Sequence, residues 1–338
     1  MHATALALFL EFLSTSTAMC IAGAALFLIG GWAAKDDVAS ARGLDKIVAL
    51  ANLCYAVPLA VFGTLHFFDA QDLVTMVPRY MPGRMFWVYF VGCALIAAAL
   101  SIATKIAVRW SGLLVGIMMF MFVGMLYLPF ALQHMHAPNI RFTWTIVFRE
   151  SSFGGAGWVL AGMAKDGWRG PANRGPQHAG FSRVGAVKTT LITVGRILIA
   201  LAALFFGVQH FLHPMGLPGV PLRREMPAWV PLRALIDYVT GAALLAAGLS
   251  ILLNWKARIV AAVAGGWILL TILVIYIPVM IGALANPNLA VKIEGINYFA
   301  DTLFFAGVIL AAASAAPRAA EVPERVQRTA GAEAAAKP

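Results

Sequence analysis

Charged residues are scarce in this chain, and their scarcity excludes a soluble globular protein. Asp, Glu, Lys and Arg together make up 12% of the 338 residues, whereas hydrophobic residues make up 61%. A soluble domain has about 25% charged and 45–50% apolar residues. With a mean hydropathy of +0.82, the chain has too little polar surface to cover a water-exposed fold. We therefore predict an integral membrane protein.

Cysteine is rare as well, and its placement excludes two further classes of protein. Cys20, Cys54 and Cys93 each lie inside an apolar run, and no pair has the CxxC spacing. An odd number of cysteines at such positions excludes a disulfide framework, and no Cys/His cluster has zinc or iron–sulfur spacing. His134 and His136 alone are too few to predict a metal site. Haem and flavin motifs are absent too, so the electrons of any redox reaction would come from a partner or from the substrate.

Uncharged runs long enough to cross a bilayer, about 20 residues, are abundant. Five contain no ionisable residue: Phe12–Ala34, Ile47–Leu65, Phe86–Thr104, Trp110–Gln133 and Ile259–Ala285. Three contain a single one: Thr189–Val208 with Arg196, Leu235–Leu253 with Asp237, and Gly295–Ala316 with Asp301. A ninth run, Phe142–Ala164, is interrupted by Arg149 and Glu150. Because lipid-exposed backbone must satisfy its own hydrogen bonds, we predict an all-α polytopic fold with about nine transmembrane helices.

The net charge of +10 is explained by membrane topology and does not indicate nucleic-acid binding. If the nine helices alternate sides, sixteen Lys and Arg residues gather on one side and eight on the other. Basic residues favour the cytoplasmic side. We therefore predict a cell (inner) membrane protein in contact with the lipid bilayer, with its N-terminus outside and its C-terminus in the cytoplasm. The first run has no preceding Lys or Arg and exceeds a signal core, so we expect a retained helix.

Much of the sequence occurs twice. The segment 62–67, FGTLHF, returns 144 residues later as FGVQHF at 206–211. Eight of the eleven residues from Gly92 to Ile102 are identical to those from Gly241 to Ile251. Because four helices fall in each copy, both copies begin on the same side of the membrane. We predict a tandem duplication of a four-helix bundle, with the two copies related by an axis along the membrane normal.

The domain organisation follows from this repeat. We predict an N-terminal helix and loop at 1–43, a first four-helix repeat at 44–164, and a cytoplasmic linker at 165–188 that is rich in Gly and Pro. The second repeat covers 189–316. Residues 317–338 change abruptly to Ala, Glu and Arg and are predicted to form a disordered cytoplasmic tail.

The repeated motif resembles that of the DoxX-like membrane proteins. Its features are an FGxxHF helix end, a Pro-containing outer loop, and a second helix that starts near Pro-x-Arg and carries Gly-x-x-Leu-x-Ala-Ala. The resemblance covers both repeats and implies a four-helix membrane unit. Some members form a thiosulfate–quinone oxidoreductase or belong to membrane redox complexes. The resemblance thus implies a redox-linked role, with quinone as the cofactor and a membrane redox complex as the partner.

Polar residues are predicted to gather near the outer face, where the first helix of each repeat ends and the second begins. They are His66, Arg84 and Tyr89 in the first repeat, and His210, Arg233, Asp237 and Tyr238 in the second. A His beside a Tyr or Asp suits hydrogen bonding to a quinone and relay of its proton. An Arg suits bidentate binding of an oxyanion. The alternative is that each His caps its helix and each Arg extends to lipid headgroups. No catalytic residue is predicted.

The acidic residues differ between the repeats. Asp301 lies within a predicted helix and has no acidic counterpart in the first repeat. Ionisable residues at membrane depth face the bundle interior and often mark function. We expect Asp301 to be buried and paired with a donor such as Tyr238, Asn297 or Arg196. Glu150 and Glu294 occur in both repeats at the predicted start of the last helix, where a carboxylate stabilises the helix dipole.

Three function classes are compatible with these residues. The first is a redox-linked DoxX-like subunit that engages quinone or a small oxyanion, with an outward-opening cavity between His210 and Tyr238. The second is a structural or assembly subunit of a membrane complex, without chemistry of its own. The third is a small-solute or proton-coupled transporter, which the buried Asp301 would suit.

Overall fold

The computed structural model describes residues 14–138, 140–164 and 178–317, and these residues form helices connected by loops, with no named strand. The first part contains α2 (Thr15–Ser40), α3 (Asp45–Val48), α4 (Ala51–Phe68), α5 (Ala70–Leu73), α6 (Arg84–Thr104), α7 (Val108–Phe122), α8 (Leu128–Gln133) and α9 (Ile140–Met163). The second part contains α10 (His178–Leu212), α11 (Arg233–Leu253), α12 (Ala257–Thr271), α13 (Ile277–Leu284) and α14 (Leu289–Ser314). The predicted all-α polytopic membrane fold is confirmed.

Eight helices in the described part of the chain are long and apolar enough to cross a membrane. They include the continuous stretches Val108–Gln133 and Ala257–Leu284, each built from two α-helices. The remaining long helix, α9, has 24 residues and carries Arg149 and Glu150 in its middle. It corresponds to the ninth predicted run. The charged pair does not interrupt this helix, because the two side chains form an ion pair and are only 15% and 9% exposed.

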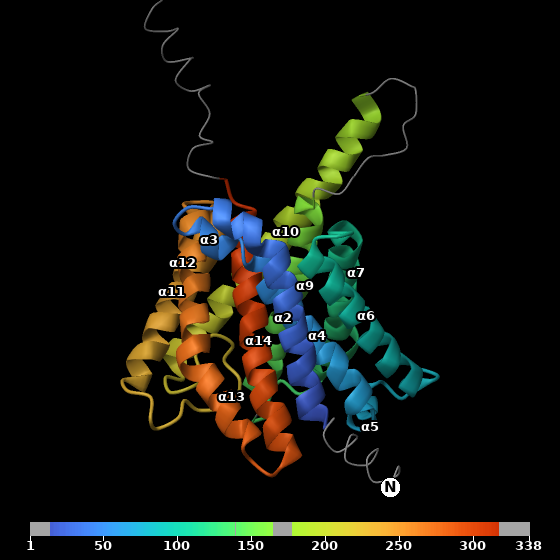
Figure 1. Cartoon of the computed structure of the whole chain (residues 1–338), viewed down its shortest axis with the longest axis vertical. Helices are drawn as coiled ribbons and strands as arrows, with labels where there is room; N and C mark the ends of the chain where they lie inside the picture. Colours follow the sequence, from blue (N-terminus) through green and yellow to red (C-terminus); the bar gives the residue numbers. More distant parts are fainter. Residues whose placement is uncertain (1–13, 139, 165–177, 318–338) are drawn as a thin grey trace, which may run out of the picture.

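The helices run between two opposite ends of the molecule (Figure 1), and α5 lies at the end opposite α3. We call the end that contains residues 69–83 and 213–232 the predicted outer side. The predicted linker is shorter than expected, since α10 begins at His178 and residues 178–188 are therefore helical. The rest of that linker and the tail from 318 onward lie outside the described residues, as do residues 1–13.

The halves 44–164 and 189–316 pack against each other through their first and last helices. The last helix of the first half, α9, packs on α10, the first helix of the second half. In return, α14 packs on α4. Within each half, the first helix contacts the second, the second contacts the third, and the third contacts the fourth. As a result most of α14 from Gly295 to Ala313 is buried, and Figure 1 shows the helix between α2 and α12.

Local backbone features of the first half recur 149 residues later. A π-helical turn occurs at Val123–Tyr127 and again at Ile272–Tyr276, and each is followed by a short helix with Pro in its first turn. A π-helical turn interrupts the regular hydrogen bonding of an α-helix and is often found at a functional site. Left-handed residues also recur, in the pairs Gly83 and Leu232, Lys105 and Asn254, and Ala107 and Lys256.

Glycines allow the first two helices of each half to approach closely. A Cβ on Gly63 would lie 3.0 Å from the carbonyl oxygen of Gly92, and a Cβ on Gly207 would lie 3.0 Å from that of Gly241. Small residues at such crossings are how helices pack in lipid, where no hydrophobic effect drives them together. The four glycines therefore allow the same close helix crossing in both halves.

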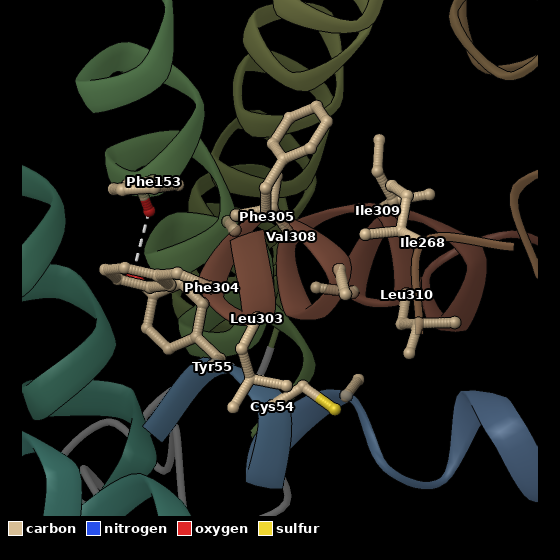
Figure 2. Close-up of a cluster of buried hydrophobic side chains, with 14 of the residues drawn as sticks. Cys54, Tyr55, Phe153, Ile268, Leu303, Phe304, Phe305, Val308, Ile309 and Leu310 are labelled. Carbon is tan, nitrogen blue, oxygen red and sulfur yellow. Dashed lines mark hydrogen bonds between the residues drawn. The ribbon is translucent and has the colours of Figure 1, made fainter. Parts of the chain in front are cut away.

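An aromatic cluster joins the halves at the centre of the molecule (Figure 2). The ring of Phe304 on α14 stacks on Phe153 of α9, with centroids 3.9 Å apart, and meets Tyr55 of α4 edge-on. The Tyr55 hydroxyl donates to the carbonyl oxygen of Phe153 at 2.8 Å. The buried hydroxyl is thereby satisfied, and α14 carries only apolar residues from Phe305 to Ala313.

Candidate functional site

His210 and Asp237 form a buried pair, as the helix geometry predicted. His210 Nδ1 lies 2.6 Å from Asp237 Oδ1, and the two side chains are 1% and 0% exposed. Asp237 Oδ2 accepts a hydrogen bond from the backbone amide of Met215 at 2.8 Å. On the other side of the imidazole, the backbone amide of Gly219 donates to Nε2 at 3.2 Å. Both residues therefore hold the loop between α10 and α11.

This loop consists of residues 213–232, and part of it is buried beside His210, where the sequence predicted a cavity between His210 and Tyr238. Leu217, Val220, Met226 and Val230 are buried. The Tyr276 hydroxyl donates to the carbonyl oxygen of Pro218 at 2.6 Å. The loop thus packs into the interior of the second half and closes it. The cavity expected between His210 and Tyr238 therefore finds no support among the described residues.

The remaining residues of the predicted outer-face site face elsewhere. Tyr238 is 40% exposed on the outside of the bundle and stacks on Phe211. Arg233 donates to the carbonyl oxygen of Met226 at 3.2 Å. In the first half, Arg84 donates to the carbonyl oxygens of Val77 and Val74. These two arginines secure the preceding loop, and neither forms an ion pair with a carboxylate in the described part of the chain.

The first half repeats the histidine and the tyrosine without forming a buried pair. His66 Nδ1 lies 2.7 Å from the carbonyl oxygen of Phe62 in its own helix. Tyr89 is exposed and stacks on Phe67, as Tyr238 stacks on Phe211. The position of Asp237 is occupied here by the buried apolar Val88. The repeated polar residues alone therefore serve local structure.

The strongest candidate site is a second group, which crosses the boundary between the halves. Arg149 on α9 donates through Nη1 to Asp301 Oδ2 on α14 at 2.8 Å. It also donates to Glu150 Oε1 through Nη2 at 2.6 Å and through Nε at 3.1 Å. The side chains of Arg149, Glu150 and Asp301 are 15%, 9% and 8% exposed. We call these three residues the central triad.

The central triad lies near the middle of two membrane-length helices. Arg149 is the tenth residue of α9 and Asp301 the thirteenth of α14, so each is roughly 14–18 Å from the start of its helix. The Arg149 guanidinium also faces the ring of Phe153, with 5.9 Å to its centroid. Buried charges at such depth are costly unless paired. Two carboxylates share a single cation here, which leaves one negative charge in excess.

Two expectations about the acidic residues are wrong. Asp301 is buried, as predicted, but its partner is Arg149 of the other half rather than Tyr238, Asn297 or Arg196. Glu150 is the eleventh residue of α9 and Glu294 the sixth of α14, so neither lies in the first helical turn. Glu294 is exposed to solvent, whereas Glu150 is buried. The common sequence position therefore does not give the two glutamates a common role.

Arg149 was not among the residues selected from the sequence. Arg149 and Glu150 appeared as an interruption of an otherwise apolar run, and that interruption was the signal that could have identified the site. A charge in a membrane helix needs a partner at the same depth. Asp301 is the acidic residue at matching depth in another run, so the two could have been paired.

Metal ligation finds no support in the described residues, since no group of three or more His, Cys, Asp or Glu side chains is placed to hold an ion. No family model, curated protein or solved structure matches the chain. The resemblance to DoxX-like proteins therefore stays a prediction, and the function must be argued from the central triad.

Proposed function

We propose that this chain is a proton-coupled membrane transporter of a small solute, and that the central triad takes up and releases the proton. The observation that carries the proposal is the shared guanidinium: Glu150 and Asp301 both bind Arg149, near the middle of two helices of membrane-spanning length. With both carboxylates ionised, the triad has a net negative charge. A proton on one carboxylate cancels it and lowers the cost of burying the group.

Polar residues extend from the triad toward the predicted outer side. Arg141, Thr145 and Arg149 are spaced four apart and so share one face of α9. The Thr145 hydroxyl lies 3.4 Å from the carbonyl oxygen of Pro221 in the 213–232 loop. On α14, Tyr298 is three residues before Asp301 and also lies toward this side. These residues place polar side chains between the outer loop and the triad, and this is the side from which the proposal has the proton enter.

The opposite direction is closed by apolar side chains. Phe153 and Phe304 stack just beyond the triad, and Tyr55 uses its hydroxyl to bind the carbonyl oxygen of Phe153. Further along α14, every residue from Val308 to Ala313 is buried and apolar. Polar side chains on one side of the triad and an apolar seal on the other are the arrangement that we expect for one state of an alternating-access transporter.

The test uses protons alone as the probe, because the solute is unidentified. In proteoliposomes on a solid-supported membrane, a rapid pH jump should produce a transient current as protons bind inside the protein. Asp301→Asn should abolish this current. The exposed Asp72, on the predicted outer side of the first half, provides the control Asp72→Asn, which should keep it. An absent wild-type current, or an unchanged current in Asp301→Asn, would refute the proposal.

The redox-linked DoxX-like subunit is the second candidate, and a lipid-facing groove favours it. This apolar groove, about 150 Å³ in volume, lies between α2, α4 and α6, with Leu26, Thr64 and Leu100 among its lining residues. A quinone dissolved in the bilayer has direct access to such a surface. If this candidate is correct, quinone should copurify with the protein, and Leu26→Trp, which fills the groove, should remove it. Purified protein without quinone would argue against it.

We also propose that the two halves are copies of one four-helix unit. The recurrence of the π-helical turns, the left-handed residues and the Gly–Gly crossings supports this proposal. A measured structure in which residues 47–164 and 189–313 cannot be superposed would contradict it.

A further inference from the structure

We infer that the predicted outer side carries a binding site for a tetrahedral oxyanion, such as phosphate or sulfate, between α9 and the 213–232 loop. A cavity of about 200 Å³ opens there to the surface and is lined by Pro138, Arg141, Phe142 and Arg223. This site is distinct from the central triad, and the inference does not depend on proton coupling.

Among the described residues, neither Arg141 nor Arg223 forms an ion pair with a carboxylate. The positive charge of Arg141 also reaches His213, whose pKa is lowered first by partial burial and then by that charge. Two guanidinium groups on one hollow repel each other unless an anion lies between them.

The two arginines that line the cavity come from different elements and are held in different ways. Arg141 is half-buried in the first turn of α9. Arg223 lies in the loop, and its guanidinium covers the ring of Phe142 at 4.2 Å from the centroid. Such stacking orients a guanidinium while its N–H groups remain available to donate. Two planar guanidinium groups from two different elements suit an anion that has oxygen atoms on several faces.

The neighbouring Arg224 strengthens the positive field at the same mouth. Its guanidinium faces the ring of Tyr298 on α14, with 6.0 Å to the centroid. The exposed Glu294 lies one turn before Tyr298 on that helix. Its charge opposes the field of Arg224, and it does not line the cavity. The cavity walls therefore present guanidinium groups without a carboxylate.

A phosphate could reach this site from solution or as the headgroup of an anionic phospholipid, and the experiment separates these sources. Titration of the full-length protein in detergent with inorganic phosphate, and separately with sulfate, should show saturable heat of binding by calorimetry. Arg223→Gln should weaken binding about tenfold or more, as expected for the loss of charged hydrogen bonds. Arg79→Gln, which removes an exposed arginine from the loop of the first half, should leave it unchanged.

The lipid source is tested in nanodiscs of phosphatidylcholine with or without phosphatidylglycerol. If a lipid headgroup is the natural ligand, phosphatidylglycerol should prevent phosphate binding and should be retained by wild type, but not by Arg223→Gln, in native mass spectrometry. If free anions are the ligand, both nanodiscs should bind phosphate equally. Because Arg223 is exposed, Arg223→Gln should remain folded. Wild type that binds neither inorganic anion and retains no more phosphatidylglycerol than Arg223→Gln would overturn the inference.

Discussion

The outer loops of the two halves begin from the same frame and end in different structures. In each half, the helix before the loop carries an FGxxHF segment near its end. An arginine after the loop then donates to a loop carbonyl oxygen seven residues earlier: Arg84 to Val77 and Arg233 to Met226. The loop of the first half lies on the surface, and within residues 69–83 only Ala70 is buried. The loop of the second half is inserted among the helices.

One substitution accounts for much of this difference. Where the first half has the buried Val88, the second has Asp237, which lies against His210 and accepts from the amide of Met215. His66, without a carboxylate beside it, binds a carbonyl in its own helix instead. The residues common to both halves therefore maintain the frame. A residue that differs, Asp237, completes the buried pair, and Asp301, whose counterpart position in the first half is Ala156 or Gly157, completes the central triad in the same way.

The largest effect should come from removing the cation shared by the halves. Arg149→Gln leaves Glu150 and Asp301 buried without a partner, which should cost about 3–5 kcal/mol of unfolding free energy. Chemical unfolding in detergent measures this loss. The double variant Arg149→Gln/Asp301→Asn should recover part of it, because it removes one of the two unpaired carboxylates. Arg141→Gln, eight residues earlier on the same helix, is the matched control, and an equal loss there would contradict the account.

Converting the second half to the first at one position should release its loop. Asp237→Val leaves His210 Nδ1 and the Met215 amide without their acceptor, each at about 1–3 kcal/mol. Hydrogen exchange should accelerate across residues 213–232. The exposed residue Asp72, in the loop of the first half, offers Asp72→Val as the control, with no change in that segment. Unaltered exchange in Asp237→Val would show that the pair does not hold the loop.

A smaller effect is expected where the inserted loop meets α14. Gly219 has φ of +106°, and a Cβ there would lie 3.1 Å from Thr302 Cγ2. Gly219→Ala should therefore destabilise the loop by about 1–3 kcal/mol. Gly216→Ala, three residues earlier, has negative φ and meets no atom closer than 3.8 Å, so it should have little effect. Thermal unfolding of the two variants compares them directly, and equal midpoints would argue against insertion.

The smallest effect should be found at the repeated tyrosines. Tyr89→Phe and Tyr238→Phe each remove a hydroxyl from a ring on the outside of the bundle, so stability should change by less than about 0.5 kcal/mol in both. The same assay can be used as for Gly219. A large loss in Tyr238→Phe alone would revive the pocket that the sequence predicted between His210 and Tyr238.

Sequence periodicity and helix geometry predicted the helices and the approach of His210 to Asp237, because both depend on neighbouring elements of the chain. The partner of Asp301 was beyond this reasoning. It depends on α9 and α14 meeting across the two halves, and hydrophobic runs do not specify which helices are neighbours. The role of the 213–232 loop was missed for a similar reason, since the sequence predicted only an outer loop and its burial depends on contacts with Tyr276 and Thr302.

The protonation of Asp301 tests the central claim most directly. Infrared difference spectra between mildly acidic and mildly alkaline pH report the carbonyl stretch of a protonated carboxylic acid. The account predicts such a band in the wild type, its loss in Asp301→Asn, and its retention in the exposed-site control Asp72→Asn. Identical spectra for wild type and Asp301→Asn would contradict the account, and would leave the central triad as a fixed ion pair that only joins the two halves.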